Sequence, residues 1–92
     1  GGNNYEACII TAQNALNDFP YTNMREDFSL LIMKSKYELA QMSVESKRLQ
    51  RYQDAEDECY GFINEYPDSK NCDLAKNYIE KCKKHTSSIE TD

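Results

Sequence analysis

Residues that break regular structure are scarce in this chain. Only three glycines and two prolines occur among 92 residues, and two of the glycines are the first two residues. Alternating runs of Val, Ile and Thr, which would indicate strands, do not occur either. A chain with so few turn residues and no strand pattern is expected to form long helices. The sequence therefore predicts an all-α protein, short enough for one small domain or a few stacked repeats.

Several signals of location and partner type are also missing. No long basic stripe occurs and the formal net charge is −5, so a nucleic-acid partner is not expected. No apolar run reaches the length of a membrane span, and no signal peptide is visible. Because the chain opens with GGNNYEA, inside a helix start, we expect a fragment of a larger protein. Any export signal or lipid anchor would then lie upstream.

The cysteines form no C-x-x-C pair; they are Cys8, Cys59, Cys72 and Cys82. An even count permits disulfides, but Cys8 and Cys59 lie at apolar positions of a helical pattern, so we expect four unpaired cysteines that mainly pack. Cys72 and Cys82 are ten residues apart on one predicted helix, about 15 Å along its axis, which excludes a disulfide between them. With His85 they offer three metal ligands but no fourth, so neither a metal nor a cofactor is expected.

Two short stretches match each other: NDFPYT at residues 17–22 and NEYPDS at residues 64–69, which lie 47 positions apart. Each reads Asn, acid, aromatic, Pro, any residue, hydroxyl. Since Pro cannot continue a helix and restricts the residue before it, each aromatic-Pro pair is expected to end a helix. The hydroxyls of Thr22 and Ser69 are then good N-caps for the next helix. The stretch therefore predicts a helix end, a turn and a helix start, used twice.

Four helices are predicted, at about residues 4–18, 22–45, 49–66 and 69–85. The second helix is apolar on two stripes: Leu30, Met33, Tyr37, Ala40 and Val44 form one, and Phe28, Leu31, Ser35, Leu39 and Met42 form the other. A helix with two apolar stripes is buried between neighbours on both sides. Helices stacked in this way form a helical solenoid, because each unit buries its face against the next.

The apolar spacing before each Pro resembles the tetratricopeptide repeat, or TPR. In that family the second helix of a repeat opens with Tyr, continues with small or aromatic residues at steps of three and four, and closes with Pro. The matching positions are Tyr5, Cys8, Ala12, Ala15 and Pro20 in the first copy, and Tyr52, Ala55, Cys59, Phe62 and Pro67 in the second. The resemblance implies an α-α superhelix of about four antiparallel helices.

The resemblance also implies how a single domain, residues 1–92, is divided. Its parts are the second helix of one repeat (1–20), a full extended repeat (21–67), a closing helix (68–86) and a polar tail (87–92). The period of 47 exceeds the usual repeat of about 34 residues. The extra residues are expected within Asn23–Arg51, as extra turns on the second helix or as a longer connection near Ser43–Leu49.

Three segments resemble the BamD family of outer-membrane assembly lipoproteins, in its Bacteroidetes form. They are YEACIITAQNALNDFPYT, LLIMKSKYELAQMSVESKRLQRYQDAEDECYGFINEYPDSK and AKNYIEKCKK, which together span nearly the whole chain. The match corresponds to the C-terminal portion of that family. It implies a TPR scaffold at the periplasmic face of the outer membrane, held by a lipidated Cys that is absent from this sequence. It also implies a non-catalytic subunit of the machinery that assembles β-barrel proteins, bound to the periplasmic domains of the central barrel subunit.

Partner-binding residues are expected on polar positions of the second helix and at the corner that follows it. These residues are Arg25, Lys34, Glu38, Lys47, Arg48 and Arg51. The basic corner could pair with acidic residues of a partner, although a solvated, salt-bridged turn would have the same sequence. Tyr37 and Tyr52 lie on apolar stripes and are expected in the core. No enzyme is expected, since the only His lies in the tail region and no nucleophile has a Gly-rich turn around it.

Two other functions stay open at this stage. A generic periplasmic TPR adaptor would bind peptides or proteins of the cell envelope and of cell division, whereas an assembly subunit binds the folded domains of a fixed complex. A co-chaperone would hold unfolded barrel precursors through exposed apolar patches. A solenoid that ends in an exposed apolar face could also form a dimer through its ends.

Overall fold

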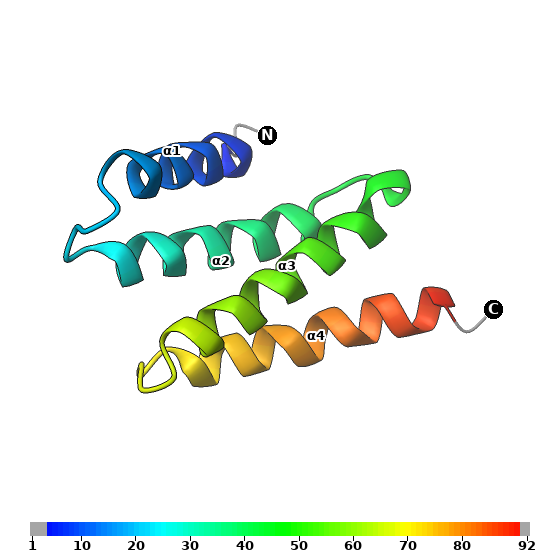
Figure 1. Ribbon diagram of the computed structural model, residues 1–92. Helices are drawn as coiled ribbons and strands as arrows, with labels where there is room; N and C mark the ends of the chain where they lie inside the picture. Colours follow the sequence, from blue (N-terminus) through cyan, green and yellow to red (C-terminus); the bar gives the residue numbers. More distant parts are fainter. Residues whose placement is uncertain (1–3, 91–92) are drawn as a thin grey trace.

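The computed structural model describes residues 4–90, and this part of the chain contains only helices and turns (Figure 1). Four helices follow one another: α1 (Tyr5–Asp18), α2 (Arg25–Gln41), α3 (Glu45–Glu65) and α4 (Cys72–Glu90). Each packs against the helix that follows it and runs back along it, so that consecutive helices form a zigzag. The molecule is flat, with principal extents of 44 × 31 × 17 Å. The predicted all-α fold of four helices is confirmed.

The predicted boundaries at the end of the second helix are wrong. α2 ends at Gln41 rather than at 45, and α3 begins at Glu45 rather than at 49. The break has a local cause. The Ser43 hydroxyl donates a hydrogen bond to the Leu39 carbonyl, and the backbone of Val44 is extended, at φ −64° and ψ 155°. Because the side-chain bond occupies an acceptor at the end of α2 and Val44 leaves the helical region, the chain turns here.

The structure bears on the two forms predicted for the extra length of the 47-residue period. Only residues 42–44 separate α2 from α3, so the predicted longer connection is absent from the structure. α2 has 17 residues and α3 has 21, of which the first seven precede Tyr52. These seven residues make about two turns. Most of the extra residues therefore extend the start of α3 rather than the end of α2.

The two copies of the repeated stretch have the same backbone structure. The aromatic residue before Pro ends the helix at φ −130° and ψ 66° for Phe19 and at φ −126° and ψ 63° for Tyr66. Each following hydroxyl accepts a hydrogen bond from the amide two residues later, at 3.2 Å for Thr22 and 3.0 Å for Ser69. The hydroxyls thus cap the turn rather than the helix, which is why α2 and α4 begin three residues later than predicted. α4 also continues to residue 90 rather than ending at 85.

The buried residues of α2 lie on both of its sides, which confirms the predicted two-sided burial. The second predicted stripe is wrong at one position: Leu31 is 40% exposed, and Ile32, which belongs to neither stripe, is buried instead. Ile32 packs with Ile9 of α1 and is 3% exposed. Met33 is fully buried and packs with Phe62 of α3 and Ile79 of α4. The ends of the stripes are not covered, because α2 stops early: Met42 is 47% exposed and Val44 is 64% exposed. Burial on two sides places α2 as an inner layer of the stack (Figure 1).

An aromatic layer joins α2, α3 and α4. The ring of Tyr37 stacks on Tyr78 of α4, with centroids 4.3 Å apart, and meets Tyr52 of α3 edge-on at 6.2 Å. Tyr52 in turn stacks on His85 of α4 at 4.1 Å. Tyr37 and Tyr52 are only 4% and 2% exposed, so both are core residues as predicted. Because side chains of α2 contact α4 as well as α3, these three helices share one core. α1 packs against α2.

The repeated motif is less buried in α1 than in α3. Tyr5 is half-buried, whereas its counterpart Tyr52 is buried between two helices. Cys8 is likewise half-buried, and its counterpart Ala55 is fully buried. Since α3 packs against both α2 and α4 while α1 packs against α2, the motif in α1 has one neighbour fewer. The face of α1 turned away from α2 is therefore the uncovered end of this stack.

The opposite end of the stack is polar. Over residues 72–87, α4 buries one stripe, made of Cys72, Ala75, Ile79, Cys82 and Thr86. In α2, Met33 and Tyr37 form the second buried side. The residues 47 positions later, on α4, are Glu80 and Lys84, and both are exposed. The described outer face of α4 is therefore polar.

Candidate interaction surfaces

The basic corner between α2 and α3 is folded back on the chain itself. Arg48 donates two hydrogen bonds to the Ser43 carbonyl, from Nε at 3.2 Å and from an Nη atom at 2.9 Å. Arg51 donates from Nη1 to the Ser43 hydroxyl at 2.7 Å. Cations at the carboxyl end of a helix satisfy its last carbonyls and interact favourably with its dipole. Two of the three predicted basic residues therefore hold the corner together, and Lys47 is the exposed one.

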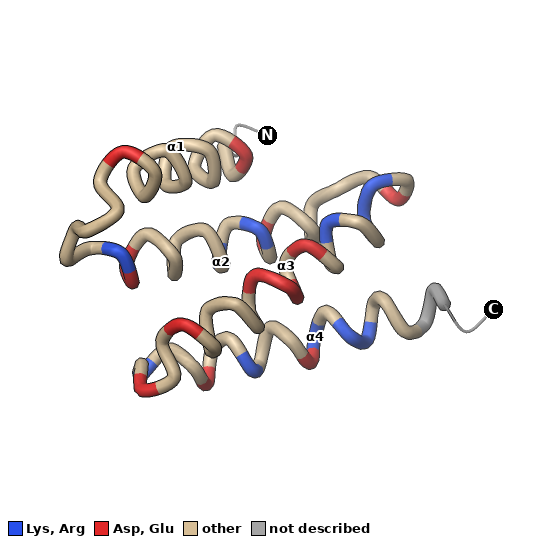
Figure 2. The backbone as a smooth tube through the Cα atoms, in the orientation of Figure 1, with Lys and Arg blue, Asp and Glu red and all other residues tan. Residues whose placement is uncertain are grey.

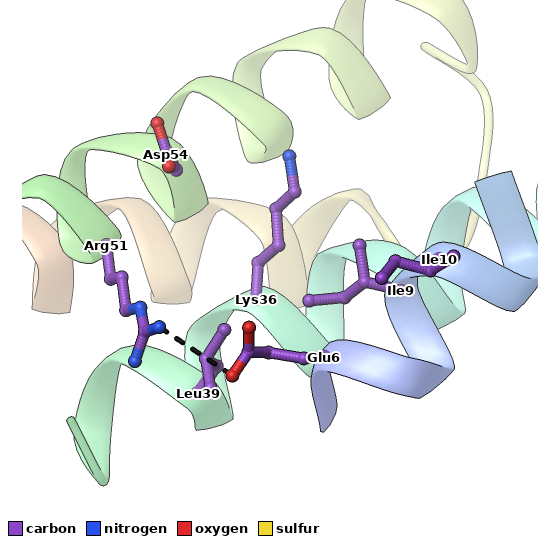
Figure 3. Close-up of a pocket in the computed structure, with 7 residues that line it drawn as sticks. All are labelled: Glu6, Ile9, Ile10, Lys36, Leu39, Arg51 and Asp54. Atoms are coloured by element: carbon purple, nitrogen blue, oxygen red, sulfur yellow. Dashed lines mark ion pairs between the residues drawn. The ribbon is translucent and has the colours of Figure 1, made fainter. Parts of the chain in front are cut away.

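A groove lies where α1, α2 and α3 meet, and Arg51 borders it (Figure 3). Its volume is about 220 Å³, and its lining residues are Glu6, Ile9, Ile10, Lys36, Leu39, Arg51 and Asp54. Arg51 and Glu6 point toward each other in Figure 3 and form an ion pair of 3.7 Å between α3 and α1. Lys36 forms a closer pair with Glu58, at 2.9 Å, between α2 and α3. The groove therefore has three aliphatic side chains, and two acidic and two basic side chains border it. Such a groove suits a small apolar side chain of a peptide.

Arg25 ties the start of α2 to both repeated turns. Its guanidinium donates from Nη1 to the Pro20 carbonyl and from Nη2 to the Glu65 carboxylate, each at 2.8 Å. The hydrogen bond that Arg25 donates to Glu65 raises the pKa of Arg25. Next to it, the Ser69 hydroxyl donates to the Glu26 carboxylate. These bonds cross-link the end of the molecule where both turns lie (Figure 1).

The predicted partner-binding residues do not form one surface. Arg25 lies at the turn end of α2, whereas Arg48 and Arg51 lie at the far end, about 25 Å away along the helix axis. Lys34 is exposed and Glu38 is half-buried, and both lie between these ends on α2. The structure therefore brings only Arg48 and Arg51 together, at Ser43.

An exposed apolar patch at the first turn was not predicted from the sequence. It consists of Phe19, Tyr21 and Met24, which are 66%, 97% and 48% exposed, and we call it the turn patch. A hollow beside it is lined by Asp18, Phe19, Pro20, Tyr21 and Thr22. A comparison of the two repeated stretches contains the signal that could have found it. The second turn has Asp68 where the first has Tyr21.

All four cysteines are free, as expected. Cys59, Cys72 and Cys82 are buried and Cys8 is half-buried, so they serve mainly in packing. Burial raises the pKa of Cys59 to about 12 and that of Cys82 to about 11. Thiols with such pKa values are protonated and unreactive at neutral pH. Within the described residues, no group of three or more His, Cys, Asp or Glu side chains is arranged to hold a metal ion.

Comparison with protein-family models and with curated protein sequences gives no match to this chain. Among residues 4–90, none of the helices combines the length and the apolar character that a membrane span needs.

Proposed function

We propose that this protein is a non-catalytic scaffold that binds partner proteins through the surface of a TPR-like helical stack. The observation that carries the proposal is the repeated turn, whose two copies share backbone angles and side-chain bonds 47 residues apart. The same turn, repeated along the chain, produces stacked helices with a large exposed surface for their length. The two-sided burial of α2 supports the same architecture.

We further propose that the partners belong to the β-barrel assembly machinery at the periplasmic face of the outer membrane. This step rests on the resemblance of KYELAQMSVESKRLQRY and FINEYPDSK to BamD-type lipoproteins. On this proposal the chain contacts the periplasmic domains of the central barrel subunit, and an upstream lipid anchor holds it at the membrane. The length added at the start of α3 lies in the first of these two segments.

A second candidate function is a generic periplasmic adaptor that binds peptides or proteins of the cell envelope and of cell division. The groove between α1, α2 and α3 favours it, because its apolar floor and charged rim suit a short peptide side chain. Such an adaptor would bind extended peptides, whereas the assembly subunit would bind folded domains. The uncovered face of α1 also makes a dimer a candidate in either case.

An affinity purification from envelope extract tests the proposal, with this chain as bait and quantitative mass spectrometry as the readout. Enrichment of the central barrel subunit over an unrelated helical bait is expected. The variant with Lys34→Glu and Lys47→Glu tests the exposed predicted cations and should retain the fold, because both side chains are exposed. Arg48 and Arg51 are poor test positions, since their replacement would disturb the corner at Ser43. Enrichment of peptides or cell-division proteins without the barrel subunit would support the adaptor instead.

A further inference from the structure

The turn patch has an internal control in the second copy of the same turn. Both turns have nearly the same backbone angles at the aromatic residue and the same hydrogen bond from a backbone amide to the hydroxyl. Where the first turn has Tyr21 and Met24, the second has Asp68 and Asn71. Polar residues therefore build this turn equally well, so its conformation does not require an aromatic or apolar side chain at either position.

Tyr21 is the most exposed of the large apolar side chains in residues 4–87. Tyr21 is 97% exposed and Met24 is 48% exposed, and Phe19 beside them is 66% exposed. Tyr and Met are enriched at protein interfaces, where a few large side chains supply most of the binding energy. Phe19 corresponds to Tyr66 and borders the uncovered end of α1, so its exposure has a second explanation. Tyr21 and Met24 lie outside α1, so the uncovered face of α1 does not account for their exposure, and they carry the argument.

The turn that presents these side chains is held in place from both sides. The guanidinium of Arg25 donates to the Pro20 carbonyl, one residue before Tyr21, while its other end is fixed by Glu65 of α3. Within the turn itself, the Thr22 amide donates to the Phe19 carbonyl at 3.1 Å. A segment that is fixed before binding loses less conformational entropy when it docks. The turn patch is therefore a pre-organised surface.

Several carboxylates lie at the same end of the molecule as the turn patch. Asp18 and Asp27 flank it along the chain, and both are exposed. Glu26 and Glu65 lie at the same end, and the nearby cation Arg25 is already paired with Glu65. Figure 2 shows acidic residues at the ends of α1 and α3 that adjoin the two turns. A partner with cations around an apolar recess complements this surface, whereas an anionic lipid surface is repelled by it.

We propose that Tyr21 and Met24 dock into an apolar recess with a cationic rim on a folded domain of a partner protein. The inference rests on the proposed function, which supplies the candidate partner, namely the periplasmic domains of the central barrel subunit. It adds the surface of this chain that makes the contact and the chemistry that the partner must offer. The contact lies at the opposite end of α2 from the basic corner.

Isothermal titration of the whole chain with those purified domains tests the inference. The double variant Tyr21→Asp, Met24→Asn gives the first turn the residues of the second, so it should keep the helical circular dichroism and lower the thermal midpoint by no more than about 8 °C. A loss of affinity of about tenfold or more is expected. Val44→Asp is the matched control, because it also adds a carboxylate at an exposed apolar residue, but between α2 and α3. It should change the affinity by less than about twofold.

The possible outcomes separate the two proposals. Binding that the double variant leaves unchanged overturns the inference and leaves the proposed function standing. Absence of binding by the unsubstituted chain overturns both. Loss of binding by both the double variant and Val44→Asp also overturns the inference. The loss would then come from the added negative charge and not from a contact at the turn patch. Binding of the chain to phosphatidylcholine vesicles, abolished in the double variant, would assign the turn patch to a lipid surface and overturn the protein-docking proposal.

Discussion

The three methionines of the chain test the packing of α2, because the same substitution can be made at three degrees of burial. Met33 is fully buried between α2, α3 and α4, whereas Met24 and Met42 at the ends of α2 are 48% and 47% exposed. Met33→Ala should lower the free energy of unfolding by about 3 kcal/mol, within the range of 2–5 kcal/mol for buried Met. Met24→Ala and Met42→Ala lose about half the transfer term and leave no enclosed cavity, so about 1 kcal/mol each is expected.

The expected difference between Met33→Ala and the two controls is a substantial fraction of the total stability of a chain of this size. At about 0.05–0.15 kcal/mol per residue, 92 residues give about 5–14 kcal/mol in total. At about 4–8 °C per kcal/mol, Met33→Ala should lower the thermal midpoint by about 12–24 °C, and each control by no more than about 8 °C. Urea titrations followed by circular dichroism at 222 nm give the free energies. Three variants that agree within about 0.5 kcal/mol would refute the placement of α2 as an inner layer.

Three further predictions follow from the corner and from the buried thiols. Arg48→Ala should lower the free energy of unfolding by about 1–2 kcal/mol in urea titrations, because it removes hydrogen bonds from a charged donor. Lys47→Ala should lower it by less than about 0.5 kcal/mol. Equal effects of the two substitutions would contradict the role of Arg48 in holding the corner at Ser43. The raised pKa values of Cys59 and Cys82, about 12 and 11, mean that above pH 9 the unfolded chain loses thiol protons that the folded chain keeps. The contribution of these two thiols to the free energy of unfolding should therefore be fully present below pH 9. It should fall as pH rises toward 11, by roughly 1.4 kcal/mol per pH unit for each thiol. A free energy of unfolding that stays constant over this range in denaturant titrations would contradict the prediction. Iodoacetamide at pH 8 should modify Cys8 first and reach Cys59 only in urea, as measured by mass spectrometry; early labelling of Cys59 would contradict its burial.

The positions of the helices could be predicted from the sequence because local rules decide them. Proline fixed the ends of α1 and α3, and the two apolar stripes of α2 indicated burial on both sides. The end of α2 could not be predicted in the same way. It depends on the side chain of Ser43, which bonds to Leu39 and receives Arg51 from the next helix. Nothing in the local apolar pattern distinguishes that arrangement from a helix that continues to 45.

The candidate sites were harder to predict because charge and exposure depend on neighbours. Arg25, Arg48 and Arg51 read as available cations in the sequence, yet each donates to an acceptor within the chain. Long basic side chains reach groups that are distant in sequence, so their pairing is a property of the fold. Tyr21 shows the converse case, since an aromatic residue next to a helix end is expected to pack, and here it is 97% exposed.

Hydrogen–deuterium exchange of the chain, with and without the purified periplasmic domains of the central barrel subunit, tests the scaffold function most directly. Mass spectrometry of peptic fragments then reports protection along the sequence. At a saturating concentration of those domains, we expect slower exchange in the segment around Tyr21 and little change in the basic corner around Lys47. Unchanged exchange throughout residues 4–90 would contradict the proposal that this helical stack is a scaffold for those domains.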